Sequence, residues 1–153
     1  MIDFINKFFF YKKLIFILFL VYNQSLSANS FVSTKLSKVN MRTGPGIHYP
    51  IKLIYIRKNL PMKVIENFEN WKKVCDIDEQ CGWIKGTLLS NKSYAIIKKD
   101  TFGYKEQSID SKVTMKIDKF AIMETKKCNE NWCLLFALKR KAWVNRSFIW
   151  GVE

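Results

Sequence analysis

The feature of this sequence that most constrains its fold is an internal repeat. Two segments each carry Glu-Asn-Trp, and an expected strand follows that tryptophan. A second tryptophan comes 12 residues after the first in one segment and 11 residues after it in the other. The four residues are Trp71 and Trp83 in the first segment, and Trp132 and Trp143 in the second. The repeat predicts two copies of one small unit in tandem, over residues 33–90 and 94–152.

Within each copy the pattern is that of β-strands. Short apolar stretches rich in branched residues, such as 51–56 and 62–65, are bounded by turn residues at 43–46 and 58–61. Several short strands separated by turn clusters predict a small sheet closed on itself. Outside the N-terminal segment no window shows helical periodicity, so the predicted fold class is all-β. A single 3₁₀ turn is expected near 85–88 and again near 145–148.

The N-terminal segment, residues 1–27, has the three parts of a secretory signal peptide. Basic residues come first, an apolar run over 14–22 follows, and small residues precede Ala28. We expect cleavage near Ser27-Ala28 and a periplasmic or otherwise exported mature chain. The alternative is an uncleaved anchor, but the strictly apolar run is far shorter than the roughly 20 residues that span a bilayer. No stable membrane span is therefore expected in the mature form.

The four cysteines fall into two close pairs, Cys75 with Cys81 and Cys128 with Cys133. Each pair sits where two expected strands meet at a turn, so its Cβ atoms can lie within disulfide range. Four cysteines allow three pairings, of which we favour the local one. The spacing lacks Cys-x-x-Cys, and the chain has one histidine, so neither a metal site nor a redox-active pair is expected.

The charge is strongly basic, with a formal net value of +13. Residues 1–27 hold three lysines and one aspartate, which leaves +11 for the mature chain. Such an excess indicates anionic partners, such as an acidic glycan or a membrane surface. A bias toward Lys, Asn and Ile explains the same charge without a ligand, and the lysines are scattered rather than grouped. Export argues against a nucleic-acid partner.

The first copy resembles the bacterial SH3 domain. The resemblance rests on 39–46 (Val-Asn-Met-Arg-Thr-Gly-Pro-Gly), on Tyr49-Pro50, on 60–65, on 70–74 (Asn-Trp-Lys-Lys-Val) and on 82–84 (Gly-Trp-Ile). The whole chain is similar to the two-copy exported SH3-like proteins of alphaproteobacteria, whose second copy also carries Cys-x-x-x-Trp-Cys. The resemblance implies two tandem small SH3-type β-barrels after a signal peptide.

The second copy departs from this pattern. Counting back from the first tryptophan of each copy aligns Met41-Arg42 with Phe102-Gly103, and there the Arg-x-Gly-Pro-Gly sequence is missing. We therefore treat the second barrel as degenerate, and expect a ligand site, if one is built on this loop, in the first copy.

The resemblance also implies where a ligand would bind. SH3-type barrels bind in the cleft between their first long loop and the distal hairpin. The ligand-groove candidates are Arg42, Tyr49, Tyr55, Trp71 and Trp83. The alternatives are structural, because Gly44-Pro45-Gly46 also suits a plain tight turn, and a tryptophan repeated in both copies also suits the centre of a small barrel.

No constellation of catalytic residues is present in the sequence. His48 is the single histidine and has no expected nucleophile beside it, so we predict a non-enzyme without cofactors. The predicted function is a binding module for peptidoglycan or for an envelope peptide or protein segment. The alternative is an accessory subunit that holds a protein partner through barrel edges. Its expected contact residues are Phe120, Lys126, Lys127, Lys139, Lys141 and Trp150.

Overall fold

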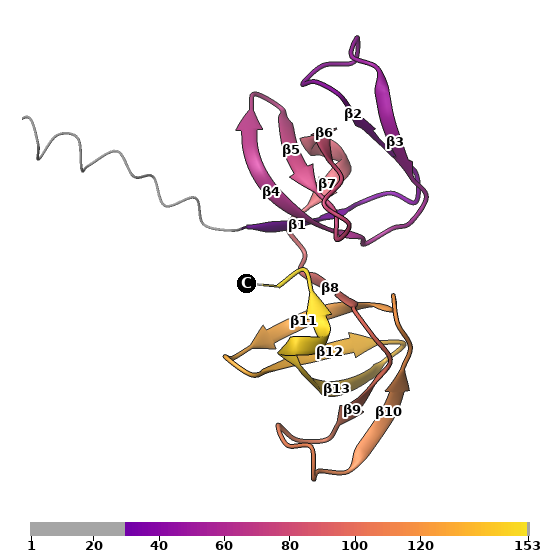
Figure 1. The fold of residues 1–153 in the computed structure, drawn as a ribbon, viewed down its shortest axis with the longest axis vertical. Helices are drawn as coiled ribbons and strands as arrows, with labels where there is room; N and C mark the ends of the chain where they lie inside the picture. The colour runs from indigo at the N-terminus through magenta and orange to yellow at the C-terminus, as the bar shows by residue number, and fades with distance from the viewer. Residues whose placement is uncertain (1–29, 153) are drawn as a thin grey trace, which may run out of the picture.

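The computed structural model of the protein describes residues 30–152, which form two seven-stranded sheets and two 3₁₀ turns (Figure 1). The predicted signal segment and its cleavage point at Ser27-Ala28 lie outside the described residues. The all-β class and the tandem arrangement are confirmed. Within residues 30–152 no helix has the length and apolarity that crossing a membrane requires.

The first barrel follows the order β3-β2-β6-β5-β4-β1-β7 across its sheet. Its elements are β1 (Phe31–Thr34), β2 (Val39–Arg42), β3 (Ile51–Tyr55), β4 (Pro61–Phe68), β5 (Trp71–Cys75), β6 (Cys81–Lys85), η1 (Gly86–Leu88) and β7 (Leu89–Ser90). All pairings in this sheet are antiparallel. Because successive side chains of a strand point to opposite faces, each strand presents alternate residues to the inside and the outside of the barrel.

The second barrel repeats this topology in the order β10-β9-β13-β12-β11-β8-β14. Its elements are β8 (Tyr94–Ile97), β9 (Thr101–Tyr104), β10 (Val113–Ile117), β11 (Ile122–Cys128), β12 (Trp132–Ala137), β13 (Arg140–Asn145), η2 (Arg146–Phe148) and β14 (Ile149–Trp150). Both 3₁₀ turns lie where the sequence predicts them.

Each barrel has its own apolar core. The first core includes Met41, Val74 and Ile84, all fully buried, and the second includes Leu135 and Val144, also fully buried. Buried residues alternate with partly exposed ones along β2 and along the second half of β13, as expected of a sheet with one face toward water. Neither Trp71 nor Trp83 belongs to the first core cluster, although both are buried.

The register between strands corrects the alignment of the two copies by one residue. Arg42 lies opposite Trp83 in the β2–β6 ladder, and Tyr104 lies opposite Trp143 in the β9–β13 ladder. Tyr104, not Gly103, is therefore the equivalent of Arg42. Counting back failed because the segment that leads to the first tryptophan is one residue shorter in the second copy.

The structure contains both expected disulfides, Cys75–Cys81 and Cys128–Cys133. The first joins directly opposed residues of β5 and β6. The second joins directly opposed residues of β11 and β12, which correspond to β4 and β5 in the first barrel. The two disulfides therefore reinforce different hairpins, although each was expected from the same local spacing.

The two barrels touch at a small junction beside the linker 91–93. The Phe31 and Trp150 rings meet edge to face at 5.2 Å, and the Ser33 hydroxyl donates to the carbonyl oxygen of Lys92 at 2.9 Å. Figure 1 shows the C-terminal strand β14 returning to this junction. Within the described part of the chain, β8 pairs with β11 and β14 of its own barrel and with no strand of the first barrel. The two described barrels therefore touch and do not share a strand.

Candidate functional site

The strand register places five side chains of the first barrel in a row across one face of the sheet. Directly opposed residues of neighbouring strands project to the same side. The pairings link, in order, Ile51, Arg42, Trp83, Lys73 and Glu66. We call these residues the outer row of barrel one. The row faces away from the core, because the adjacent Met41, Gly82 and Val74 face inward and are buried.

Two tryptophans form the apolar part of this outer face. Trp83 lies in the outer row, and Trp71 lies two positions before Lys73 on β5, so it shares the same face. Phe68, directly opposite Trp71, meets the Trp83 ring edge to face at 6.4 Å. Although they face outward, Trp71 and Trp83 are only 8% and 9% exposed, so their neighbours cover them.

Charged side chains border these rings. The Lys73 ammonium lies 3.6 Å from a Glu66 carboxylate oxygen, so the positive charge of Lys73 already has an internal partner. Both side chains remain substantially exposed, and their ion pair contributes little to stability. Its effect is to reduce the free positive charge on this part of the face.

The first long loop is held in a defined shape. The Arg42 guanidinium donates to the carbonyl oxygen of Tyr49 at 2.7 Å, and the Thr43 amide donates to the Pro50 carbonyl oxygen at 3.1 Å. The Tyr49 ring lies against Gly44, where an added Cβ would come within 2.4 Å of a ring carbon. Tyr49 itself is 38% exposed. The loop is therefore both tight, as its glycines predict, and able to present an aromatic ring.

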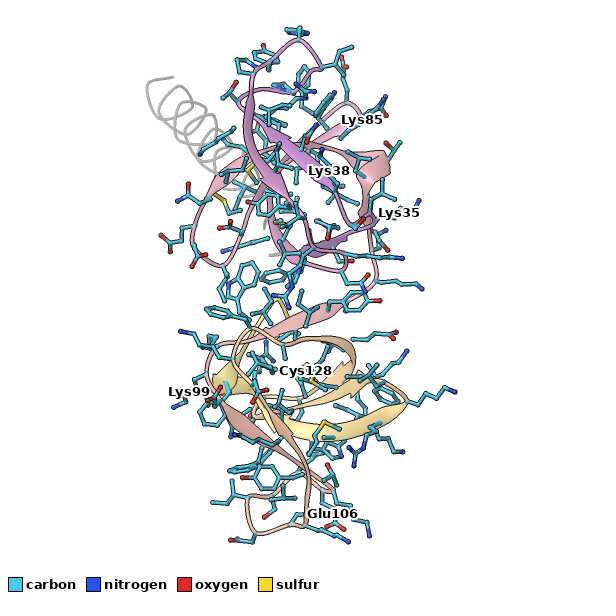
Figure 2. The ribbon with its side chains drawn as sticks, turned by 90° about the vertical axis from the view of Figure 1, so that its right-hand side faces the viewer. Lys35, Lys38, Lys85, Lys99, Glu106 and Cys128 are labelled. Atoms are coloured by element: carbon cyan, nitrogen blue, oxygen red, sulfur yellow. A yellow bond between two sulfur atoms is a disulfide. The ribbon has the colours of Figure 1, made fainter. Side chains whose placement is uncertain are left out.

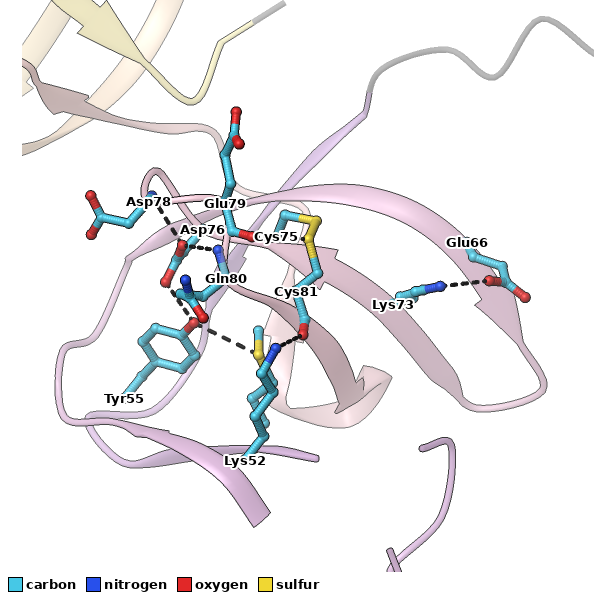
Figure 3. Close-up of a disulfide and its surroundings, with 11 residues drawn as sticks. Lys52, Tyr55, Glu66, Lys73, Cys75, Asp76, Asp78, Glu79, Gln80 and Cys81 are labelled. Carbon is cyan, nitrogen blue, oxygen red and sulfur yellow. Dashed lines mark hydrogen bonds and ion pairs between the residues drawn. A yellow bond between two sulfur atoms is a disulfide. The ribbon is translucent and has the colours of Figure 1, made fainter. Parts of the chain in front are cut away.

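Tyr55 lies apart from this loop, at the other end of β3. Its hydroxyl donates to an Asp76 carboxylate oxygen at 2.8 Å, while the other Asp76 oxygen accepts from the amides of Asp78 and Gln80 (Figure 3). Burial raises the pKa of Tyr55 above its ordinary value, and the Asp76 carboxylate raises that pKa further. Tyr55 thus joins β3 to the turn that the Cys75–Cys81 disulfide closes.

The structure therefore brings together four of the five sequence candidates: Arg42, Trp71 and Trp83 on one face, and Tyr49 on the loop that Arg42 holds. Tyr55 is separated from them by the length of β3. Sequence reasoning missed Phe68, although its place opposite Trp71 across the turn at 69–70 is a recognisable hairpin pattern.

The second barrel carries an equivalent row with different side chains. The pairings link, in order, Val113, Tyr104, Trp143, Leu134 and Lys127. We call these residues the outer row of barrel two. Trp143 is more exposed than its equivalent Trp83, and the same holds for Trp132 and Trp71. Where the first barrel has Glu66, the second has Lys127.

A cavity of about 430 Å³ lies beside the junction of the barrels. Phe31, the linker residues Asn91 and Ser93, and the β11 segment 125–128 contribute to its lining. No group of three or more His, Cys, Asp or Glu side chains among residues 30–152 is arranged to hold a metal ion.

Comparison with known proteins gives one family match. The model described as bacterial SH3 domain matches twice, at residues 35–91 and 103–151. A search of curated proteins finds no significant match.

Two solved structures are similar to this chain at low identity. NlpC2 from Trichomonas vaginalis aligns with 9% identity and a TM-score of 0.37, over 82% of this chain and 49% of that one. An NlpC/P60 family protein from Bacillus cereus aligns with 12% identity and a TM-score of 0.37, over 79% of this chain and 56% of that one. The chain spans about half the length of these two proteins.

Proposed function

The chain belongs to the bacterial SH3 domain family, and from this premise we propose that it is an exported, non-catalytic module that binds peptidoglycan or a peptide or protein segment of the cell envelope. Modules of this family are typically binding domains rather than enzymes. The fold itself hosts many functions, so the proposal depends on the surface that this chain presents.

The observation that carries the proposal is the loop beside the outer row of barrel one. Arg42 holds the loop through the Tyr49 carbonyl oxygen, and Gly44 lets the Tyr49 ring pack close to the backbone. A ring that is fixed in place yet exposed loses little conformational entropy when a ligand covers it. This arrangement supports Tyr49 as the ligand-facing residue, with Arg42 as its support.

Two observations support export of the protein. The two disulfides are typical of a protein that matures in an oxidising compartment. The basic, apolar and small-residue parts of residues 1–27 match a secretory signal peptide in composition. Together they favour the periplasm, with the signal segment removed near Ser27-Ala28.

The test is retention of the purified protein on isolated peptidoglycan. We expect the native protein to be retained and Tyr49→Ala to be retained less, by about tenfold in affinity if the ring carries about 1.4 kcal/mol. Tyr55→Phe is the control, because it alters a tyrosine at the end of β3 that lies away from the loop carrying Tyr49. The proposal for peptidoglycan fails if neither the native protein nor the control is retained.

A second candidate function is favoured by the edge strand β3. Among residues 30–152, β3 pairs with one strand, β2. Three isoleucines at or just after β3, namely Ile51, Ile54 and Ile56, are 47%, 49% and 81% exposed. An exposed apolar edge is suited to pairing with a strand of another protein. Crosslinking in cells separates the two candidates, since one abundant protein partner favours edge docking and peptidoglycan fragments favour the first proposal.

The second barrel carries the contact residues that the sequence predicts for an accessory subunit, and two of them are less suited to this role than expected. Trp150 packs against Phe31 at the junction, so its ring already has a partner within the chain. Phe120 is 49% exposed, with the Lys119 ammonium 4.6 Å from its ring centroid. The apolar edge of the first barrel is a better candidate than this surface.

A further inference from the structure

The two barrels share a fold, but the last two residues of their outer rows differ in charge. In barrel one the end of the row is the ion pair between Lys73 and Glu66. In barrel two the same two positions are Leu134 and Lys127, which oppose each other in the β11–β12 ladder. The acidic Glu66 of barrel one thus corresponds to the basic Lys127 of barrel two, and Lys73 corresponds to the apolar Leu134.

Lys127 occupies a position that favours an anion beside an aromatic ring. Its ammonium lies 5.2 Å from the centroid of the Trp143 ring, within the range of a cation–π interaction. Lys127 itself is exposed. The acid on the same strand, Glu124, is engaged by the neighbouring Lys126. Among residues 30–152 no salt bridge involves Lys127.

The aromatic side chains around Lys127 are held in place. The Tyr104 and Trp132 rings meet edge to face at 5.8 Å, and Tyr104 is the ladder partner of Trp143. The Cys128–Cys133 disulfide joins the residues that follow Lys127 and Trp132 in sequence. The turn between Cys128 and Cys133 is tied to the β9–β10 loop by the side-chain amide of Asn129, which donates to the side-chain oxygen of Gln107 at 2.6 Å. The Tyr104 and Trp132 rings and the turn that follows Lys127 are therefore held in place.

We propose that the outer face of barrel two, formed by Tyr104, Trp132, Trp143 and Lys127, binds an acidic glycan. The inference rests on the proposed binding role and assigns it to the second barrel with a specific ligand chemistry. A sugar ring offers C–H groups that pack on the electron-rich face of an indole or phenol. A carboxylate on the same rigid ring can reach the Lys127 ammonium.

Within residues 30–152 the topology leaves no free strand edge at this face, so a peptide cannot bind here by strand addition. A peptide that binds a sheet by strand addition needs a free strand edge. The strands that carry the face, β9, β13, β12 and β11, each have a neighbour on both sides in the sheet order. Their main chains are therefore engaged, and the face offers only rings and charge.

The test uses three soluble probes on the purified protein, with binding followed by tryptophan fluorescence and calorimetry. Oligogalacturonate carries a carboxylate on every sugar ring, chitohexaose has sugar rings without charge, and polyglutamate has carboxylates without sugar rings. We expect oligogalacturonate to bind most tightly and its affinity to fall with added salt, because exposed charges are screened. Equal or tighter binding of chitohexaose or polyglutamate would overturn the proposal, as would no binding of oligogalacturonate.

Lys127→Glu gives barrel two the acid that barrel one has at this position. We expect at least about a tenfold loss of affinity for oligogalacturonate, as for the loss of an ion pair next to a ring, and retention of binding in Lys127→Arg. Lys35→Glu changes the net charge equally but lies on the first barrel (Figure 2), and should leave the affinity within about twofold. Equal losses in Lys127→Glu and Lys35→Glu would show that only the overall charge matters.

The outcomes separate this inference from the proposed function. If peptidoglycan retains the protein but oligogalacturonate does not bind, the glycan site fails and the binding module stands. If oligogalacturonate binds through Lys127 while peptidoglycan is not retained, the peptidoglycan proposal fails and the glycan site stands.

Discussion

At the scale of single residues, three polar side chains of the first barrel position loops and turns. Arg42 holds the Tyr49 carbonyl oxygen, and Tyr55 holds Asp76, which in turn orders the turn at 76–80. Thr34 acts in the same way, since its hydroxyl donates to the Arg57 carbonyl oxygen and accepts from the Leu60 amide. Each of these side chains joins two segments that are separated by 7 to 26 residues in sequence.

The Tyr55–Asp76 contact predicts a stability loss at alkaline pH. Burial and the Asp76 carboxylate raise the pKa of Tyr55 in the folded protein, whereas in the unfolded chain that pKa is about 10. A group with a raised folded pKa contributes stability that is present below pH 10 and lost as pH rises above it, because the unfolded chain ionises first. Urea unfolding between neutral pH and pH 11 measures this loss.

Tyr55→Phe is the variant that tests the assignment. At neutral pH we expect it to lower the free energy of unfolding by about 1–2 kcal/mol, because the hydrogen bond to a charged acceptor is removed. Above pH 10 its stability should fall less steeply than that of the native protein. Parallel pH profiles for the native and variant proteins would contradict the role given to Tyr55.

At the scale of elements, equivalent hairpins in the two barrels are joined by different chemistry. Cys128 and Cys133 correspond to Asn67 and Lys72, where the Lys72 ammonium donates to the Asn67 side-chain oxygen at 2.6 Å. Cys75 and Cys81 correspond to Phe136 and Lys141, an opposed pair without a covalent bond. Of these two hairpins, each barrel therefore closes one with a disulfide and leaves the other to ordinary cross-strand contacts.

The two disulfides should differ in their contribution to stability. Closing a loop of five or six residues raises the free energy of unfolding by about 2 kcal/mol, because it lowers the conformational entropy of the unfolded chain. This contribution should be the same for both disulfides. Cys133 is also fully buried in the second core, whereas Cys75 and Cys81 are only partly buried. We therefore expect Cys128→Ala/Cys133→Ala to destabilise its barrel more than Cys75→Ala/Cys81→Ala, as measured by denaturant unfolding. Equal losses would show that burial of Cys133 adds nothing.

At the scale of the whole molecule, the junction between the barrels depends on the end of the second one. Gly151 follows β14 with a φ of +102°, a conformation that favours glycine. An added Cβ would lie 2.7 Å from a Pro61 side-chain carbon of barrel one and 2.8 Å from the Tyr94 carbonyl oxygen. The chain can therefore pass this close to β4 only because position 151 has no side chain.

Gly151→Ala should loosen this junction. We expect each barrel to stay folded but the contact between Phe31 and Trp150 to weaken, so that small-angle scattering shows a broader range of intramolecular distances. Gly86→Ala is the matched control, since an added Cβ there would approach the Asn70 carbonyl oxygen only to 3.2 Å. An unchanged scattering profile for Gly151→Ala would contradict the proposed role of the junction.

Much of the architecture could be predicted because it is encoded locally. The turn residues, the alternating apolar residues, the repeated tryptophans and the close cysteine spacing each depend on residues a few positions apart. These patterns led to the all-β class, the tandem barrels and the two disulfide pairs. The candidate site was predicted less well, because Tyr55 is close to Tyr49 in sequence yet lies at the opposite end of β3.

The repeat that opens the sequence determined by itself that this protein is a pair of similar barrels, since equal patterns of short-range preference fold alike. Only the tertiary structure decided that Trp71 and Trp83 face outward, that Tyr104 replaces Arg42, and that Lys127 takes the place of Glu66 beside Trp143. The reason is that the register between strands sets which side chains share a face. Register is settled by closure of the whole barrel around its core, which involves residues distant in sequence.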